Sequence, residues 1–344
     1  MKKILVLVLA LAMVIGTISG CSKKQEENTT ETTTAAAEST AASETTASTE
    51  KIKIGIVQHV DHPSLNQIRE TIISELDAAG MSDKIEIVFE NANGDASLLP
   101  SIMQSLVSDG VDMIVPIATP TAQAAAAATT AIPIVFSAVS NPVEAGLVTA
   151  FDAVDSNITG VSNSIAIEDI FALAAELSPE AKTFGFVYNS SEINSVTGIN
   201  RAKAYCDANG IAYKEATITG TADIQQAASS LVNEVDAFFT PNDNMVASAM
   251  PVYLQVATDN NLPIYVGADS MVNDGGLATV GIDYTVLGKQ TADMVIRIVN
   301  GEQISDNPVE VINQYAKMIN INTANTLGIT IPEEMKDDFV IIGE

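Results

Sequence analysis

The chain has 344 residues, two of them cysteines, and a formal net charge of −27 at pH 7. This length suffices for one large or two medium domains. The negative charge argues against a nucleic-acid partner, because a phosphate-binding surface needs clustered lysines and arginines. With so few cysteines, the chain has no disulfide framework.

Residues 1–21 have the pattern of an export signal. A basic start is followed by an apolar run over residues 4–18, which is too short to span a bilayer, and small residues then lead to Cys21. The tetrapeptide 18–21 (Ile-Ser-Gly-Cys) resembles the lipobox of bacterial lipoproteins, in which the cysteine becomes the lipidated N-terminus. The resemblance implies a signal peptide over 1–20, a palmitate-type anchor on Cys21, and a place on the extracytoplasmic face of the cell membrane. An ordinary secretory signal is the alternative.

Residues 22–50 are almost entirely Thr, Ala, Ser and Glu. Such a composition cannot bury enough apolar surface to offset the entropy lost on ordering. We therefore predict that residues 21–50 form a lipidated, disordered tether, which would hold the next domain roughly 30 Å from the membrane.

From residue 52 onward, apolar strands alternate with helical patterns. The predicted elements are strand 52–57, helix 63–79, strand 85–89, helix 97–108, strand 113–117, helix 121–130 and strand 133–136. These strands lack a polar face, which is typical of a parallel sheet covered by helices on both sides. The alternation indicates a βαβ series.

The pattern restarts near residue 183. The predicted elements are strand 183–188, helix 195–209, strand 212–218, helix 221–233, strand 237–240, helix 244–260, strand 263–266, helix 285–300 and a strand-like segment 309–312. Two series of similar size predict two lobes, with residues 157–161 joining them. The fold class is therefore α/β, with two doubly wound parallel sheets.

Short polar side chains follow nearly every predicted strand. Because ligands of open α/β sheets bind outside the carboxyl ends of the strands, these residues are the candidates for a binding site. They are Gln58, Thr119, Ser137, Asn141, Asn189, Ser190, Ser191, Asn194, Ser195, Asn242, Asp243 and Asp269. Each could instead cap a helix, and Thr119-Pro120 predicts an N-cap followed by proline. Two facing polar rims favour a ligand, and free helix N-termini there would attract a carboxylate.

Catalytic patterns are missing from the sequence. His59 and His62 are the only histidines, and a zinc site would need a distant carboxylate beside them. No P-loop, nucleophile elbow or catalytic triad is recognisable. We therefore predict a binding protein with no enzymatic activity, no cofactor and no metal.

Seven stretches match one known family in order and spacing. They are residues 54–58 with His62-Pro63, 109–115, 117–120, 132–139, 187–195, 241–249, and 281–284 with Leu287-Gly288. Together they resemble the ABC-transporter substrate-binding lipoproteins of the family that includes tryptophan- and aromatic-amino-acid-binding proteins. Tyr188 and Asp283 lie within these stretches and join the candidate ligand-binding residues.

The resemblance implies a type I periplasmic-binding-protein fold, with two lobes joined by three crossovers. Lobe 1 would comprise residues 52–160 plus 285–310, and lobe 2 residues 161–284 plus 311–344. The implied function is that of an extracytoplasmic substrate-binding protein of an ABC importer. It would capture a small solute by hinge closure and deliver it to a permease, whose ATPase drives import. Permease and ATPase would be separate chains, and the protein itself a monomer.

The arginines indicate the kind of ligand. Sugar binders of this fold usually place arginines around the sugar, whereas Arg69, Arg201 and Arg297 all fall inside predicted helices. This favours a ligand held by neutral groups and helix N-termini, such as an amino acid, possibly aromatic. The alternatives are a sugar- or nucleoside-binding protein of the same fold, a chemosensory receptor module that signals to a membrane kinase, and an extracellular enzyme.

Specific roles can be assigned to some candidates for an amino-acid ligand. Thr119, Ser137 and the turn 189–191 would hold the carboxylate, and Asp243 or Asp269 would pair with the ammonium group. Phe136 and Tyr188, at strand ends, would either contact an apolar side chain or belong to the core.

Overall fold

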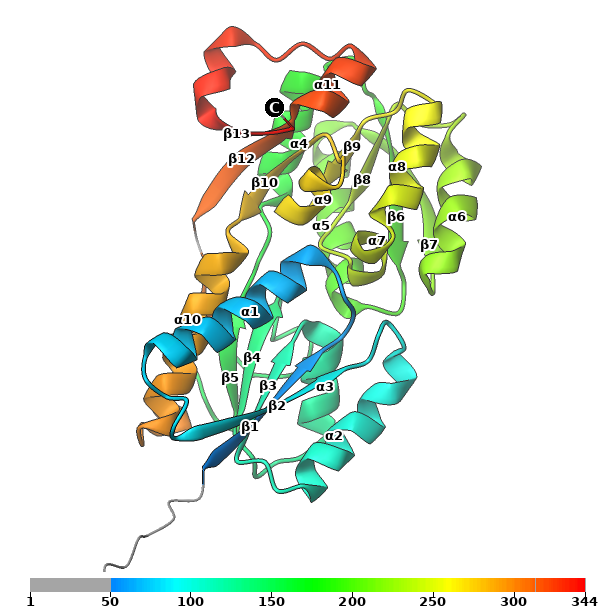
Figure 1. The fold of residues 1–344 in the computed structure, drawn as a ribbon. Coiled ribbons are helices and arrows are strands. Elements are labelled where there is room, and N and C mark those ends of the chain that lie inside the picture. The colour runs from blue at the N-terminus through cyan, green and yellow to red at the C-terminus, as the bar shows by residue number, and fades with distance from the viewer. Residues whose placement is uncertain (1–50, 313, 344) are drawn as a thin grey trace, which may run out of the picture. The chain divides into compact units, whose positions relative to one another are not determined.

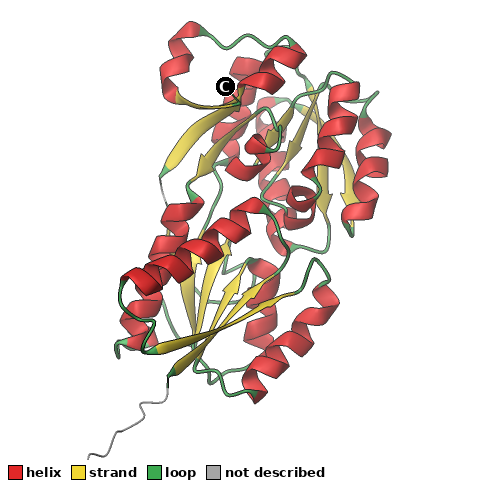
Figure 2. Ribbon diagram, viewed as in Figure 1, coloured by secondary structure: helices red, strands yellow, loops and turns green. Residues whose placement is uncertain are grey.

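The computed structural model describes residues 51–312 and 314–343, which are built around two sheets (Figure 1). The predicted signal peptide, the tether and Cys21 lie outside the described residues. Helices flank both faces of each sheet (Figure 2), as predicted for an α/β fold. The predicted fold class is thus confirmed.

The first sheet has the strand order β11-β5-β4-β3-β1-β2, and all its described pairings are parallel. Its strands β3, β4 and β5 are buried along their whole length, which explains their continuous apolar sequences. The strands are β1 (Ile52–Gln58), β2 (Ile85–Asn91), β3 (Met113–Ile117), β4 (Ile134–Val139), β5 (Ile158–Ser162) and β11 (Glu310–Val311).

Two pairs of helices cover this sheet. Helices α1 and α10 pack on each other over one face, where Ile54 and Ile56 of β1 meet Ile68 and Leu287. Helices α2 and α3 cover the other face, onto which Val57 points. The helices are α1 (Pro63–Ala78), α2 (Leu99–Ser108), α3 (Thr119–Ala128) and α10 (Tyr284–Val299), with short 3₁₀ turns η1 (Ala96–Leu98) and η3 (Ile304–Asp306).

The second sheet has the strand order β13-β12-β10-β9-β8-β6-β7, and β12 runs antiparallel to β10. Like the first, it places its first strand (β6) between its second and third, the doubly wound arrangement. The strands are β6 (Thr183–Asn189), β7 (Ala212–Ile218), β8 (Ala237–Thr240), β9 (Ile264–Val266), β10 (Ala278–Ile282), β12 (Tyr315–Asn320) and β13 (Phe339–Ile342).

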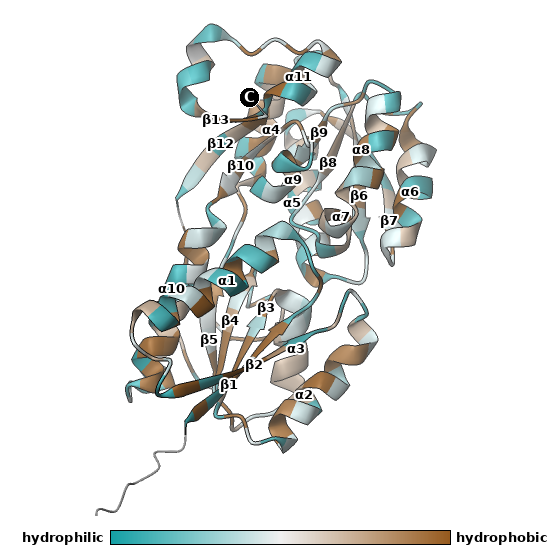
Figure 3. Ribbon diagram, in the orientation of Figure 1, coloured by the Kyte–Doolittle hydropathy of each residue, from teal (hydrophilic) through white to brown (hydrophobic). Residues whose placement is uncertain are grey.

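Helices again cover both faces of the second sheet. An aromatic cluster around Phe171, Phe186 and Phe239 fills the face beneath α4 and α5. Helices α6 and α8 cover the opposite face, and the strands carry most of the hydrophobic colour (Figure 3). The helices are α4 (Ile167–Leu177), α5 (Ile193–Asn209), α6 (Ile224–Leu231), α7 (Asn244–Ser248), α8 (Met250–Asp259), α9 (Asp269–Asn273) and α11 (Ile321–Leu327), with η2 (Thr221–Asp223) and η4 (Glu333–Asp338).

Three predictions about elements were wrong. Most of the segment 157–161, predicted to join the lobes, belongs to β5, which lies between β4 and β11 in the first sheet, and Gly160 lets this strand pack closely on Phe136. The predicted helix 244–260 is broken at Ala249, since Pro251 begins a new helix there. No N-cap forms at Thr119, because Ala118 occupies that position and Thr119 is the first residue of α3.

The sequence interpretation also omits several elements. Helix α4 has buried residues at helical spacing, such as Ile167, Ile170 and Ala174, so its signal is local. Strand β10 and the elements after residue 312 are short, and their partners in the sheet define them.

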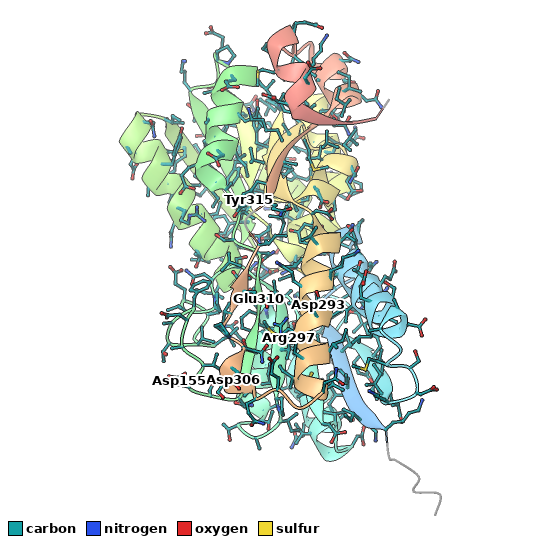
Figure 4. The ribbon with its side chains drawn as sticks, turned by 90° about the vertical axis from the view of Figure 1, so that its left-hand side faces the viewer. Asp155, Asp293, Arg297, Asp306, Glu310 and Tyr315 are labelled. Atoms are coloured by element: carbon teal, nitrogen blue, oxygen red, sulfur yellow. The ribbon has the colours of Figure 1, made fainter. Side chains whose placement is uncertain are left out.

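Within the described residues, the chain passes between the two sheets three times. The passages lie between β5 and α4, between β10 and α10, and between β11 and β12. Hydrogen bonds join the segments next to these passages (Figure 4). Arg297 of α10 donates to Glu310 of β11 at 2.6 Å, and the Tyr315 hydroxyl donates to the Ser164 carbonyl, which follows β5, at 2.8 Å. The first sheet takes its strands from 52–162 and 310–311, the second from 183–282 and 315–342. The exact lobe boundaries stay a prediction.

Candidate functional site

The carboxyl ends of the strands in the two sheets border one cavity between the lobes. Its free volume in this structure is about 20 Å³, within about 360 Å³ of space between atoms that includes open solvent. Ten of the fifteen described residues that line it are polar, and Asp243 is the one carboxylate among them. The lining residues are His62, Ser64, Leu65, Thr119, Ala138, Ser140, Asn163, Asn194, Asn242, Asp243, Asn244, Ala247, Ala268, Met271 and Tyr284.

The turn from β3 into α3 presents Thr119 to this cavity. Ala118 adopts a φ of 79°, which a residue with a Cβ rarely adopts, and Ala138 at the end of β4 has a φ of 59°. The Thr119 side chain is buried, yet its hydroxyl has no hydrogen-bond partner within the described part of the chain. Two strained residues and a free hydroxyl at one edge of a sheet mark a binding surface.

The start of α1 contributes His62 and Ser64. His62 precedes the helix, as predicted, and its Nε2 lies 3.4 Å from Oδ1 of Asn244 in the second lobe. Burial lowers the pKa of His62 to about 4, so the ring is neutral at pH 7. Ser64 donates to the hydroxyl of Ser270 in the second lobe at 2.6 Å.

The turn between β6 and α5 holds a buried carboxylate, Glu192. Side-chain amides of Asn189 and Asn194 donate to it at 3.2 and 3.1 Å, and the Asn244 amide donates to it as well. Burial raises the pKa of Glu192, and the three amide donors act in the opposite direction.

Asp243 caps α7 beside the Glu192 carboxylate. Its carboxylate accepts from the backbone N–H groups of Val246 at 2.9 Å and Asn189 at 2.6 Å. Burial, and secondarily the charge of Glu192, raises the pKa of Asp243 to about 7. Both oxygens of Asp243 thus already accept hydrogen bonds from the backbone of lobe 2.

Four of the fourteen predicted ligand-binding residues line the cavity: Thr119, Asn194, Asn242 and Asp243. Asn141 lines a neighbouring cavity, which shares Ser140, Asn194 and Asn242 with the first one. Arg201 also lines this neighbouring cavity, where it donates to the Ile165 carbonyl and to Glu168.

The remaining predicted residues lie behind or beside the cavity wall. Gln58 bonds to Asn66 and Arg69, Ser137 to Thr291, and the Tyr188 hydroxyl to Glu215. Asp269 and Asp283 accept from backbone N–H groups at the starts of α9 and α10. Ser195 is buried next to Asn194, and Asn189 binds Glu192, whereas Ser190 and Ser191 are exposed. Phe136 is fully buried in the core.

Sequence reasoning missed several members of the wall, among them His62, Ser64, Asn163, Met271 and Tyr284. His62 and Ser64 carry a usable signal, because His62-Pro63 starts the helix after the first strand. Met271 and Tyr284 belong to α9 and α10 and reach the cavity only through the packing of the two lobes.

Across residues 51–312 and 314–343 no cluster of three His, Cys, Asp or Glu side chains could hold a metal ion. Over the same residues, no helix has the length and hydropathy needed to cross a bilayer.

Two doubly wound lobes, three passages between them and a cavity at the facing strand ends define a two-lobed ligand-binding protein. The family model of the ABC transporter substrate binding protein matches residues 53–338. The chain belongs to this family, whose members work outside the cytoplasm. Its function is that of the extracytoplasmic substrate-binding component of an ABC transporter, as predicted.

The chain is similar to three characterised proteins in particular. A tyrosine-binding protein of Clostridioides difficile (strain R20291) is 35% identical over 95% of this chain and 92% of its own. The ABC domain from Streptococcus pneumonia in complex with L-Trp is 36% identical, with a TM-score of 0.83 over 86% of this chain and 100% of that one. A ligand-free, open substrate-binding protein with adhesive properties from Clostridium difficile is 37% identical, with a TM-score of 0.64 over 85% and 99%.

The two structural comparisons also indicate whether the lobes are open or closed in this structure. Sequence identity to the two proteins is nearly equal, yet the structure resembles the L-Trp complex much more than the open protein. Direct hydrogen bonds join the lobes, such as Ser64 to Ser270 and Asn242 to Ser140. The structure is therefore a closed form.

Proposed function

We propose that this protein captures a free aromatic amino acid, tyrosine or tryptophan, between its lobes and delivers it to a membrane permease. The observation that carries the proposal is the interlobe cavity, whose polar wall combines free hydrogen-bonding atoms with apolar side chains. The relatives described above, one named for tyrosine and one solved with L-Trp, support this class of ligand.

The first lobe supplies the site for the ligand's carboxylate. The Thr119 hydroxyl is buried and has no bond to any of the described residues, so it is available as a donor. It stands at the first residue of the ten-residue helix α3, whose N-terminus favours negative charge. Of the residues predicted for the carboxylate, Thr119 is the one that lines the cavity.

Apolar groups around the cavity suit an aromatic side chain. Leu65, Ala138 and Ala247 line it together with Met271 and Tyr284. A methionine thioether and a tyrosine ring both make favourable contacts with an aromatic ring.

Closure of the lobes would be the functional motion. The lining residues are nearly all buried in the closed form, so a ligand has to enter while the lobes are apart. It stabilises the closed form by binding that form more tightly than the open one. The closed protein then docks on a permease, with the ATPase and permease as separate chains, and performs no chemistry itself.

The N-terminal segment supports attachment to the membrane. We propose that the mature protein is a monomer anchored by lipid on Cys21, with residues 22–50 as the tether. Radioactive palmitate labelling in a bacterial host would test this, with Cys21→Ala as the control that loses both label and membrane attachment.

Isothermal titration of residues 51–344 tests the ligand class directly. The protein should be unfolded and refolded first, so that any ligand acquired in the host is removed. Tyrosine or tryptophan should bind and raise the melting temperature, by several degrees at about 100 times Kd. Leucine, ribose and adenosine serve as controls. Binding of ribose or adenosine alone would overturn the proposed ligand class.

A further inference from the structure

Glu192 lies behind the cavity wall, where its fully buried carboxylate is surrounded by asparagines. Oε2 accepts from Nδ2 of Asn194 at 3.1 Å and from Nδ2 of Asn244, and Oε1 accepts from Asn189 at 3.2 Å. Both oxygens are acceptors in these contacts, so each of the three neighbouring amides turns its NH₂ group toward the carboxylate. Asn194 and Asn244 both line the cavity.

The orientation of Asn194 has a consequence for the cavity. Its NH₂ group is engaged by Glu192, Ser195 and the Asn242 carbonyl, so Oδ1 is its free polar atom. This oxygen is buried and has no partner among the residues that the structure describes. Asn242 is similar: its NH₂ group donates to Ser140 at 2.7 Å, and its Oδ1 is likewise unpaired in the described chain.

The orientation of the Asn244 amide also fixes which nitrogen of His62 donates a hydrogen bond. Because the Asn244 NH₂ group faces Glu192, its Oδ1 faces Nε2 of His62 at 3.4 Å. A neutral histidine that donates from Nε2 presents Nδ1 as an acceptor. Nδ1 of His62 is buried, and no described residue pairs with it. Three free acceptors, from Asn194, Asn242 and His62, therefore belong to side chains that line one cavity.

An ammonium group matches this set, because it offers three donors and no acceptor. A carboxylate is disfavoured there, since it would face lone pairs only. We propose that Glu192 is a positioning residue: it orients the Asn194 and Asn244 amides so that the cavity presents acceptors to the α-ammonium group of the ligand. This inference rests on the proposed function and replaces Asp243 or Asp269 as the group that contacts the ammonium.

The test compares an amino acid with its analogue that lacks the ammonium group. Tyrosine and 3-(4-hydroxyphenyl)propionate share every other group, so the ratio of their Kd values reports on the ammonium site alone. Wild-type protein should prefer tyrosine by about 100-fold or more, since loss of a charge-assisted hydrogen-bond partner leaves buried acceptors unpaired.

Glu192→Met removes both acceptor oxygens at similar size and should reduce this preference at least about tenfold, because the Asn244 amide is then free to reverse and the Asn194 amide keeps only Ser195 and the Asn242 carbonyl to orient it. Glu192→Gln should restore the preference to within about threefold. Its carbonyl oxygen can take the place of Oε2, and the Asn189 amide, which does not line the cavity, can reverse to meet the new NH₂ group at the cost of its bond from the Ser191 N–H, which affects stability rather than the ratio of Kd values. Glu215→Met, in the same lobe but away from the cavity, should leave the ratio unchanged.

Asn194→Ala gives a second readout that does not depend on folding of Glu192→Met. It removes one acceptor and should raise the Kd for tyrosine at least about fivefold, while the Kd for the analogue stays unchanged. Equal weakening of both ligands in Glu192→Met, or an unchanged ratio in Asn194→Ala, would overturn the role of Glu192 while leaving the proposed function intact. Failure of wild-type protein to bind tyrosine or tryptophan would overturn the proposed function, and the ammonium site with it.

Discussion

Ser64 at the start of α1 and Ser270 in α9 face each other across the two lobes, with 2.6 Å between their hydroxyl oxygens. Both side chains are buried, so water does not compete for this bond in the closed form. Asn242 and Ser140 form a second direct bond between the lobes at 2.7 Å. The chain itself thus contributes contacts that exist only when the lobes are closed, and a ligand adds to them.

Ser64→Ala should shift the lobes toward the open form. Loss of one hydrogen bond made only in the closed form costs about 0.5–1.5 kcal/mol, so ligand affinity should fall about two- to twelvefold. Titration calorimetry measures the affinity, and small-angle X-ray scattering of the ligand-free protein should report a larger radius of gyration.

Ser74→Ala is the matched control for this substitution. Ser74 belongs to the same helix, but its hydroxyl bonds to the Thr71 carbonyl within the helix. It should change neither affinity nor scattering. If Ser64→Ala and Ser74→Ala give the same affinity, the bond to Ser270 does not contribute to closure.

Thr119→Val should lower the affinity for the ligand without destabilising the protein. The hydroxyl of Thr119 is buried in the cavity and forms no bond within the described chain, so its loss breaks no contact of the free protein. Affinity for tyrosine or tryptophan should fall about tenfold, while the melting temperature of the free protein stays the same or rises.

Thr240→Val provides the comparison for Thr119→Val. Thr240 also has a buried hydroxyl without a partner among the described residues, but it does not line the cavity. The same chemical change there should leave affinity unaltered. Equal affinities in the two variants would remove Thr119 from the binding site.

Ligand affinity should fall on acidification because of His62. Burial in the closed form lowers its pKa to about 4, whereas a solvated histidine in the open form titrates near 6.5. Closure therefore releases a proton below about pH 6.5, and acid favours the open form. Between pH 7 and pH 5, affinity should fall about twentyfold from this residue alone.

His62→Gln tests the origin of this pH dependence. His59 and Asp61 also lie near the His62 ring, and Asp243 lies near His59, so the difference between the two pH profiles isolates His62. The variant should bind less tightly at pH 7, having lost the Nδ1 acceptor, but with a flatter profile between pH 7 and 5. Parallel profiles for wild type and variant would contradict the assignment.

Gly160→Ala should strongly destabilise the fold. A Cβ at this position would lie 2.1 Å from the Phe136 carbonyl oxygen, and the φ of 155° is unfavourable for alanine. We expect a loss of about 3 kcal/mol or more, measured by denaturant unfolding. Gly220→Ala, with no atom within 4 Å of the added Cβ, should change stability by less than about 0.5 kcal/mol. Similar unfolding midpoints for the two variants would contradict the close packing of β4 and β5.

Much of the architecture could be predicted because its signals are local. Strand β4 is apolar throughout since both of its faces are covered, and α5 ends at Gly210, which adopts the left-handed conformation. The position of β5 could not be predicted in the same way. Residues 157–161 contain Asn, Thr and Gly, which are typical of a connection, and only their pairing with β4 makes them a strand.

The same distinction between local signals and contacts of distant segments applies to the binding site. Local patterns are enough to show where polar groups follow strands, and they predicted Thr119, Asn194, Asn242 and Asp243, which line the cavity. Which of those groups remain free depends on contacts between distant segments. Asp243 is committed to the backbone around α7, whereas Glu192, distant from Asn244 in the chain, turns the asparagine amides around it. Hydrogen-bond partners come from segments about fifty residues apart, and a local pattern carries no information about such pairings.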